Sequence, residues 1–83
     1  MEKKDNDLTL GRLRVGQRGV VTSLHAQGIM RRRLLDLGLV PGTIVESIRR
    51  SPAGDPTAYS IRGAVIALRS EESCKIYVDL YQM

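Results

Sequence analysis

Hydrophobic and polar residues alternate along most of this 83-residue chain, and the period changes once, near the middle. Alternation rich in β-branched residues is typical of half-buried strands. It predicts five short strands, over residues 19–24, 43–50, 57–62, 64–68 and 75–80. Segments rich in Pro and Gly separate them, so we expect a loop over residues 51–56 and a tight turn at Gly63.

The second predicted strand carries one residue that breaks the pattern. Glu46 lies between Ile44 and Ile48 and shares their face. A β-bulge, or an edge position with a partner for Glu46, would accommodate this charge.

The last predicted strand alternates without a break. Its pattern turns Ile76, Val78 and Leu80 inward. Tyr77 and Asp79 then face outward. Just before this strand, residues 70–73 predict one helical turn, capped by Ser70.

Between the first two strands the hydrophobic period lengthens to that of an α-helix, over residues 26–37. One stripe of this helix holds Ala26, Met30, Leu34 and Leu37. Gly28 is expected to weaken the first turn by up to about 1 kcal/mol relative to Ala. The ordered helix should therefore begin near Ile29.

Two glycines and a proline follow the helix in an informative order. Gly38 occupies the place where a left-handed C-cap favours glycine. In the segment 40–43, Pro41 presets φ and Gly42 supplies the positive φ of a type II turn. Together with the strands, these signals predict a mainly-β fold, a small barrel of about five strands with one short inserted helix.

Composition indicates a single small domain over residues 8–83, preceded by a polar segment, 1–7, that we expect to be frayed. No apolar stretch approaches the roughly 20 residues of a membrane-spanning helix, so we expect no direct membrane insertion. The net charge of +4 lies mainly in residues 1–50, which hold ten Lys/Arg against five Asp/Glu. Such a basic face suits an acidic partner surface or nucleic acid.

The residues that could carry chemistry are few. His25 and Cys74 are the single histidine and the single cysteine, so they are weak candidates for a metal site and cannot form a structural zinc site alone. Cys74 is expected to pack in the core. We expect no enzyme activity, no cofactor and no bound metal.

The segment Leu34-Leu35-Asp36-Leu37-Gly38-Leu39-Val40-Pro41-Gly42-Thr43 resembles the hallmark R-L-x-x-L-G-[LI]-x-P-G of the ferrous iron transport protein A (FeoA) family. Supporting segments are Leu13-x-x-Gly16, Gly54-Asp55-Pro56, residues 66–69 and residues 76–78. The similarity covers about residues 8–80.

This resemblance implies an SH3-like barrel and a cytoplasmic accessory role in bacterial ferrous iron uptake. It implies a partner too, the large ferrous iron permease of the FeoB type, which carries a cytosolic GTP-binding domain. The family's action on that permease could be docking, tuning of its nucleotide cycle or help in its assembly.

Several residues are candidates for binding such a partner: Arg31, Arg32, Arg33, Leu39, Val40 and Tyr77. The arginines could equally form a solvated helix face, and one of them could act as an arginine finger. Leu39 and Val40 could instead cover the barrel end, and Tyr77 with Tyr81 could cover a strand edge. Residues expected to shape the structure itself are Met30, Leu34, Leu37, Gly38, Pro41 and Gly42.

Two other functions fit the sequence. A small basic barrel could bind nucleic acid, although only three tyrosines are available for base stacking, so we expect no nucleic acid partner. A metal-sensing or metal-carrying SH3-like domain is the other alternative. Self-association is compatible with the sequence as well.

Overall fold

Five antiparallel strands form one sheet in the computed structural model, which describes residues 8–82. They are β1 (Arg18–Leu24), β2 (Ile44–Arg50), β3 (Thr57–Ile61), β4 (Ala64–Leu68) and β5 (Ile76–Tyr81). Their order in the sheet is β4-β3-β2-β1-β5. The five predicted strands are confirmed, whereas the expectation of a frayed segment over residues 1–7 lies outside the described residues.

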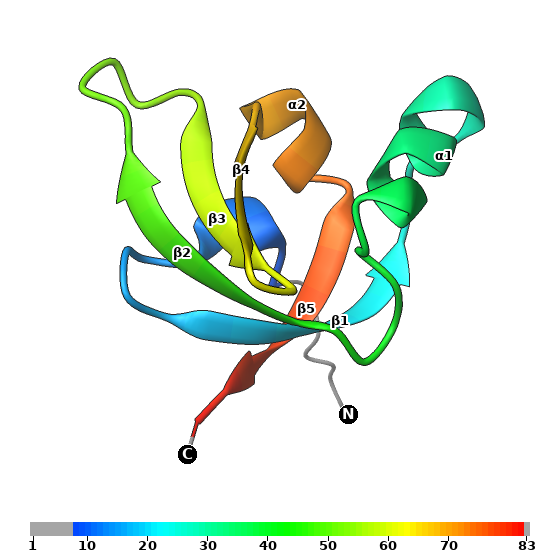
Figure 1. Ribbon diagram of the computed structural model, residues 1–83, viewed down its shortest axis with the longest axis horizontal. Helices are drawn as coiled ribbons and strands as arrows, with labels where there is room; N and C mark the ends of the chain where they lie inside the picture. The colour runs from blue at the N-terminus through cyan, green and yellow to red at the C-terminus, as the bar shows by residue number, and fades with distance from the viewer. Residues whose placement is uncertain (1–7, 83) are drawn as a thin grey trace, which may run out of the picture.

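Three helical segments complete the fold over residues 8–82. The 3₁₀ turn η1 (Leu10–Arg12) precedes β1, α1 (Gly28–Asp36) connects β1 to β2, and α2 (Ser70–Ser73) connects β4 to β5. Figure 1 shows a strongly curved sheet from which α1 projects to one side. The inserted helix and the helical turn before the last strand are therefore confirmed.

The core is aliphatic with one aromatic residue, Tyr59, which is 1% exposed. Strands and helical segments both contribute to it. Its members are Leu10, Leu13, Val21, Ala26, Leu34, Leu39, Val45, Tyr59, Ile61, Leu68, Ile76 and Val78. Leu34 and Leu39 flank the end of α1, so this helix is anchored to the barrel through its last turn.

Glu46 is accommodated on the outward face of β2, because the buried positions of this strand are Val45 and Ser47. A β-bulge is present as well, between Ser47 and Arg49, but Glu46 precedes it and pairs with Ser60 in regular register. Because β2 lies inside the sheet, the alternative of an edge position is wrong. Arg18 on β1 lies opposite Glu46 and approaches its carboxylate to 3.5 Å.

Leu80 does not face the core as predicted, and its side chain is 43% exposed. It pairs with Gly19 near the start of β1, where β5 runs past the covered part of the sheet (Figure 1). The alternation of hydrophobic and polar residues does not show where a strand extends beyond the hydrophobic core.

Ser70 is not the cap of α2, because the N-cap residue is Arg69. Two carboxylates satisfy the first amides instead. Glu72 Oε1 accepts from the Arg69 N–H at 3.1 Å, and Asp55 Oδ1 accepts from the Ser70 N–H at 2.8 Å.

Gly28 opens α1 with a φ of +63°. The predicted weakness of this turn relative to alanine is wrong here, since alanine rarely adopts that φ. The expected start near Ile29 agrees with the observed start to within one residue.

The end of α1 has the predicted left-handed glycine. Gly38 has a φ of +102° and donates its N–H to the Leu35 carbonyl at 2.9 Å. The Leu39 N–H donates to the Leu34 carbonyl at 3.1 Å. These two bonds form a Schellman motif. Leu34 and Leu39, which are joined by the second bond, are both buried.

The predicted Pro-Gly turn follows at once. Gly42 has a φ of +97°, and the Thr43 N–H donates to the Val40 carbonyl at 3.0 Å. The turn is also bonded to β1, because the Gly42 N–H donates to the Val21 carbonyl at 2.8 Å and the Val21 N–H donates to the Thr43 carbonyl at 2.9 Å. The connection between α1 and β2 is therefore bonded at both ends.

Replacing Gly38 should destabilise the protein in a graded manner. An added Cβ would lie 2.6 Å from Cδ of Arg62, and the positive φ strains any L side chain. We expect Gly38→Val to lower the free energy of unfolding by about 1–2 kcal/mol or more. Gly38→Asn should cost least, because asparagine tolerates this region best. Urea unfolding measures the series, and a valine variant as stable as the parent would show that the helix ends elsewhere.

Candidate functional site

The three consecutive arginines of α1 are all exposed, but their side chains make different contacts. Arg31 donates from Nη1 to the Leu24 carbonyl at the end of β1, at 3.0 Å. Arg33 forms an ion pair with Glu72 of α2. Two of the three guanidinium groups thus fasten α1 to the barrel.

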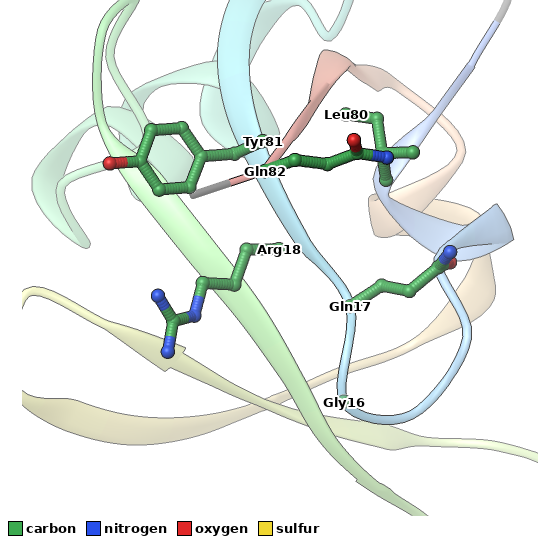
Figure 2. A pocket seen from close by; sticks show the side chains of 6 residues that line it. All are labelled: Gly16, Gln17, Arg18, Leu80, Tyr81 and Gln82. Atoms are coloured by element: carbon green, nitrogen blue, oxygen red, sulfur yellow. The ribbon is translucent and has the colours of Figure 1, made fainter.

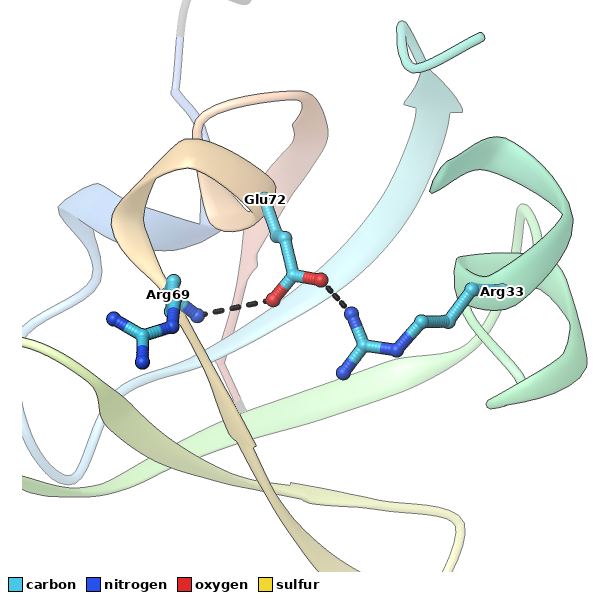
Figure 3. Close-up of polar contacts among 3 residues, drawn as sticks. All are labelled: Arg33, Arg69 and Glu72. Carbon is cyan, nitrogen blue, oxygen red and sulfur yellow. Dashed lines mark hydrogen bonds and ion pairs between the residues drawn. The ribbon is translucent and has the colours of Figure 1, made fainter. Parts of the chain in front are cut away.

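Figure 3 shows how the carboxylate of Glu72 lies between α1 and α2. One oxygen meets Arg33 and the other accepts the backbone N–H of Arg69. The side chain of Glu72 is only 10% exposed. A nearly buried carboxylate needs such partners, since its desolvation is otherwise costly. The sequence alone does not predict this ion pair, because Arg33 and Glu72 are far apart along the chain.

Arg32 points away from these contacts. Over residues 8–82 it makes no ion pair or hydrogen bond, and none joins it to Asp36 one turn later. Ile29, one turn earlier, is 88% exposed. The positions i, i+3 and i+7 place Ile29, Arg32 and Asp36 on one outward stripe of the helix. We call this stripe the outer face of α1.

A shallow hollow of about 390 Å³ lies against the outer face. Its lining residues are Gly28, Arg31, Arg32, Leu35 and Asp36. The sequence analysis did not identify Ile29 as a surface residue. The helical period does predict its exposure, because Ile29 is not on the stripe of Met30, Leu34 and Leu37 that packs toward the core.

The other predicted contact residues are placed differently. Leu39 is 0% exposed, so it belongs to the core and its predicted partner contact is wrong for this structure. Val40 is half-buried in the turn after α1. Tyr77 is half-buried, and its ring lies 4.4 Å from that of His25, centroid to centroid. Because His25 directly precedes α1, Tyr77 lies near the start of this helix.

The weak metal candidates do not assemble a site. His25 is exposed and lies within 3.1 Å of the Ser23 hydroxyl, through Nε2. Cys74 is exposed rather than packed in the core, because it follows α2 and its thiol donates to the Glu71 carbonyl at 3.6 Å. Within residues 8–82, no three His, Cys, Asp or Glu side chains gather closely enough to hold a metal ion.

Another hollow, of about 330 Å³, opens between the start of β1 and the end of β5. Figure 2 shows Arg18 and Tyr81 extending to the same side of the two strands, as their paired register requires. The remaining lining residues are Gly16, Gln17, Leu80 and Gln82. This lining contains neither a histidine nor a carboxylate, and the Arg18 charge is already paired with Glu46. It therefore carries no catalytic constellation.

The family model described as the FeoA domain matches residues 8–80. The chain belongs to the FeoA family. The motif that carried the resemblance, residues 34–43, is the glycine-ended helix and Pro-Gly turn described above.

Three proteins show how this FeoA chain relates to known ones. It is 32% identical over 73 residues to an Fe(2+) transport protein A/Fe(2+) transporter FeoB fusion protein of Porphyromonas gingivalis. That match covers 88% of this chain and only 9% of the fusion protein.

Two solved structures share its fold. The FeoA protein of Chlorobium tepidum superposes with a TM-score of 0.84 at 37% identity, covering 90% of this chain and 71% of that one. The FeoA of Stenotrophomonas maltophilia in complex with zinc, described as a prokaryotic SH3 domain protein, gives a TM-score of 0.77 at 33% identity. It covers 87% of this chain and 89% of that one. The predicted SH3-like fold is confirmed.

Among the described residues of this FeoA domain, no helix is long and apolar enough to span a membrane.

The ion pair between Arg33 and Glu72 should contribute measurably to stability. We expect Arg33→Gln to lower the free energy of unfolding by about 1–2 kcal/mol, because it leaves a nearly buried carboxylate short of a partner. Arg32→Gln makes the same charge change on the same helix and should stay within about 0.5 kcal/mol of the parent.

A double-mutant cycle with Glu72→Gln isolates the pair. The combined variant should lose less than the sum of the two single losses. Strict additivity would mean that Arg33 and Glu72 do not interact in solution.

Proposed function

We propose that this FeoA domain is a non-enzymatic accessory module of bacterial ferrous iron uptake. It docks on the cytosolic part of a FeoB-type permease and modulates its activity or assembly. The observation that carries this proposal is the Porphyromonas gingivalis relative, in which a segment 32% identical to this chain belongs to a fusion with the Fe(2+) transporter FeoB.

A fusion of this kind supports a direct contact. Joining two modules in one polypeptide raises the effective concentration of one at the other to the millimolar range for short linkers. A weak docking surface is then sufficient. The same surface in a separate chain needs stronger anchors, and arginine is one of the residues that most often provide them.

The outer face of α1 has such an arginine next to an exposed apolar side chain. Ile29 supplies an apolar side chain that is 88% exposed, and Arg32 has no charge partner within residues 8–82. Arginine is enriched at interface hot spots because its planar fork binds carboxylates with two hydrogen bonds. The part of the outer face formed by Ile29 and Arg32 therefore fits an acidic patch on the permease that carries a small apolar pocket, with Asp36 at the other end of the stripe.

Support for an arginine finger is weaker. Arg31 and Arg33 are engaged within the domain, and Arg32 is carried by a helix that is fastened at its last turn. A finger has to enter a nucleotide site, which suits a loop better than an anchored helix. Docking is the role that this geometry favours.

The nucleic-acid alternative finds few stacking platforms among the described residues. Tyr59 is 1% exposed, Tyr77 is half-buried with its ring 4.4 Å from that of His25, and Tyr81 is half-buried. Base recognition by small barrels depends on exposed aromatic faces. A protein partner is therefore better supported than an RNA or DNA strand.

Binding to the isolated cytosolic domain of the partner permease tests the proposal. Titration calorimetry should give a dissociation constant of about 10–100 µM or tighter. Arg32→Glu and Ile29→Ser should each weaken binding by roughly tenfold or more. The matched controls are Arg49→Glu and Val65→Ser, which change an exposed arginine and an exposed valine away from α1. They should stay within about twofold of the parent.

No saturable binding up to about 1 mM would contradict docking. Equal losses for Arg32→Glu and Arg49→Glu would contradict the outer face as its site, since they would indicate general charge attraction.

A further inference from the structure

A second basic surface lies away from α1, where η1 meets the loop between β2 and β3. Two adjoining hollows, of about 310 and 510 Å³, share Gly11, Arg12 and Arg50 as lining residues. Arg14 lines the larger one. We call the two hollows together the η1 groove. Their volumes lie in the range of small-molecule sites.

The charge of the η1 groove is unbalanced. Three guanidinium groups line it, those of Arg12, Arg14 and Arg50, and they face a single lining carboxylate, Asp55. Asp55 is already engaged, because its Oδ1 accepts the Ser70 N–H at 2.8 Å. Among residues 8–82, none of the three arginines has an ion-pair partner. The groove thus offers positive charge to a ligand.

The floor of the groove consists of hydroxyl groups. Thr57, Tyr59 and Ser73 line it, and they are 6%, 1% and 3% exposed. Tyr59 donates to the Leu10 carbonyl and Ser73 to the Ser70 carbonyl, both at 3.4 Å. Such bonds are well beyond the usual 2.7–2.8 Å for a hydroxyl donor. Tyr59 also hydrogen-bonds with Ser73 and Thr57, so the floor is a cluster of linked hydroxyls in which the two long bonds to carbonyls are the ones a ligand oxygen can replace.

The electrostatics of Tyr59 agree with this arrangement. Burial raises the pKa of Tyr59 above its usual 10.0, against the opposing effects of its hydrogen bonds with Ser73 and Thr57 and of the Arg50 charge. The phenol therefore keeps its proton at neutral pH and remains a donor. The Arg50 charge lowers this pKa and the Asp55 carboxylate raises it, so the two charges at the groove act on Tyr59 in opposite directions.

The packing makes the groove a fixed feature. A Cβ on Gly11 would lie 2.7 Å from Oγ of Ser73, so η1 and α2 approach as closely as glycine allows. Donors then converge from three elements: Arg12 from η1, Arg50 from the end of β2, and Ser73 from α2. A planar carboxylate is satisfied by one arginine fork, whereas a tetrahedral phosphate offers oxygens in several directions.

We propose that the η1 groove binds the phosphate group of a small phosphate ester. Arg12 and Arg50 hold the charged oxygens, the hydroxyls of Thr57 and Ser73 donate from below, and Arg14 extends the site toward the rest of the ligand. This site is separate from the outer face of α1 and does not depend on docking to a permease.

Nuclear magnetic resonance of the ¹⁵N-labelled chain tests the site with pyrophosphate, titrated at constant ionic strength so that screening alone produces no change. We expect saturable shifts in residues 9–14, 50–57 and 70–74, with a dissociation constant of about 1 mM or tighter. Residues 28–36 of α1 should not respond. No saturation by about 10 mM, or shifts confined to α1, would overturn the proposal.

Neighbouring arginines provide the matched variants. Arg50→Gln should weaken pyrophosphate binding roughly tenfold, whereas Arg49→Gln, which lines neither hollow, should stay within about twofold. Arg12→Gln should repeat the loss from the other wall, and thermal unfolding checks that each variant is folded. Equal losses for Arg49→Gln and Arg50→Gln would overturn the site in favour of general charge attraction.

Two further ligands define the chemistry. Citrate at equal ionic strength should bind at least about tenfold more weakly than pyrophosphate, and equal affinity would overturn the assignment to phosphate. GDP tests whether the phosphate ester is a nucleotide. Tighter binding of GDP than of pyrophosphate supports a nucleotide, and equal binding supports recognition of the phosphate group alone.

Discussion

The position of α1 depends on one backbone reversal. Gly38 adopts a left-handed conformation, and the amides of Gly38 and Leu39 return to carbonyls of the last helical turn. This closure sends Leu39 into the core beside Leu34, both fully buried. Pro41 and Gly42 then turn the chain into β2, and the Gly42 amide bonds to β1. Helix, turn and sheet are thus one connected unit.

Side chains reinforce the same placement. The ion pair between Arg33 and Glu72 joins α1 to α2, and Arg31 reaches the end of β1. Arginines that look equivalent in sequence therefore divide into two that fix the helix and one, Arg32, that faces outward. A helix held at its last turn and along one side presents Ile29 and Arg32 in a constant orientation. Preorganisation of this kind lowers the entropic cost of binding a partner.

Local signals made much of this fold predictable. Alternation gave the strands, the helical period gave α1, and Gly38 with Pro41-Gly42 gave the reversal, because each rule acts within a few residues. Such local rules did not predict the partner of Arg33, the exposure of Leu80 and Cys74, or the burial of Leu39. They depend on which distant segments meet across the barrel. The η1 groove was missed for the same reason, since its arginines and hydroxyls come from segments far apart in the chain.

The central claim is that the connection between α1 and β2 is as firmly held as the sheet, so that α1 is a fixed part of the domain. Amide hydrogen exchange at Leu39 and Gly42 tests this most directly, with Ser47 of β2 as the reference, because its N–H donates to the Gln17 carbonyl at 3.0 Å, away from the connection. The account predicts that all three amides exchange only when the whole domain unfolds, at similar rates after correction for intrinsic exchange. Exchange at Leu39 and Gly42 that is orders of magnitude faster than at Ser47 would show a loosely attached helix and contradict it.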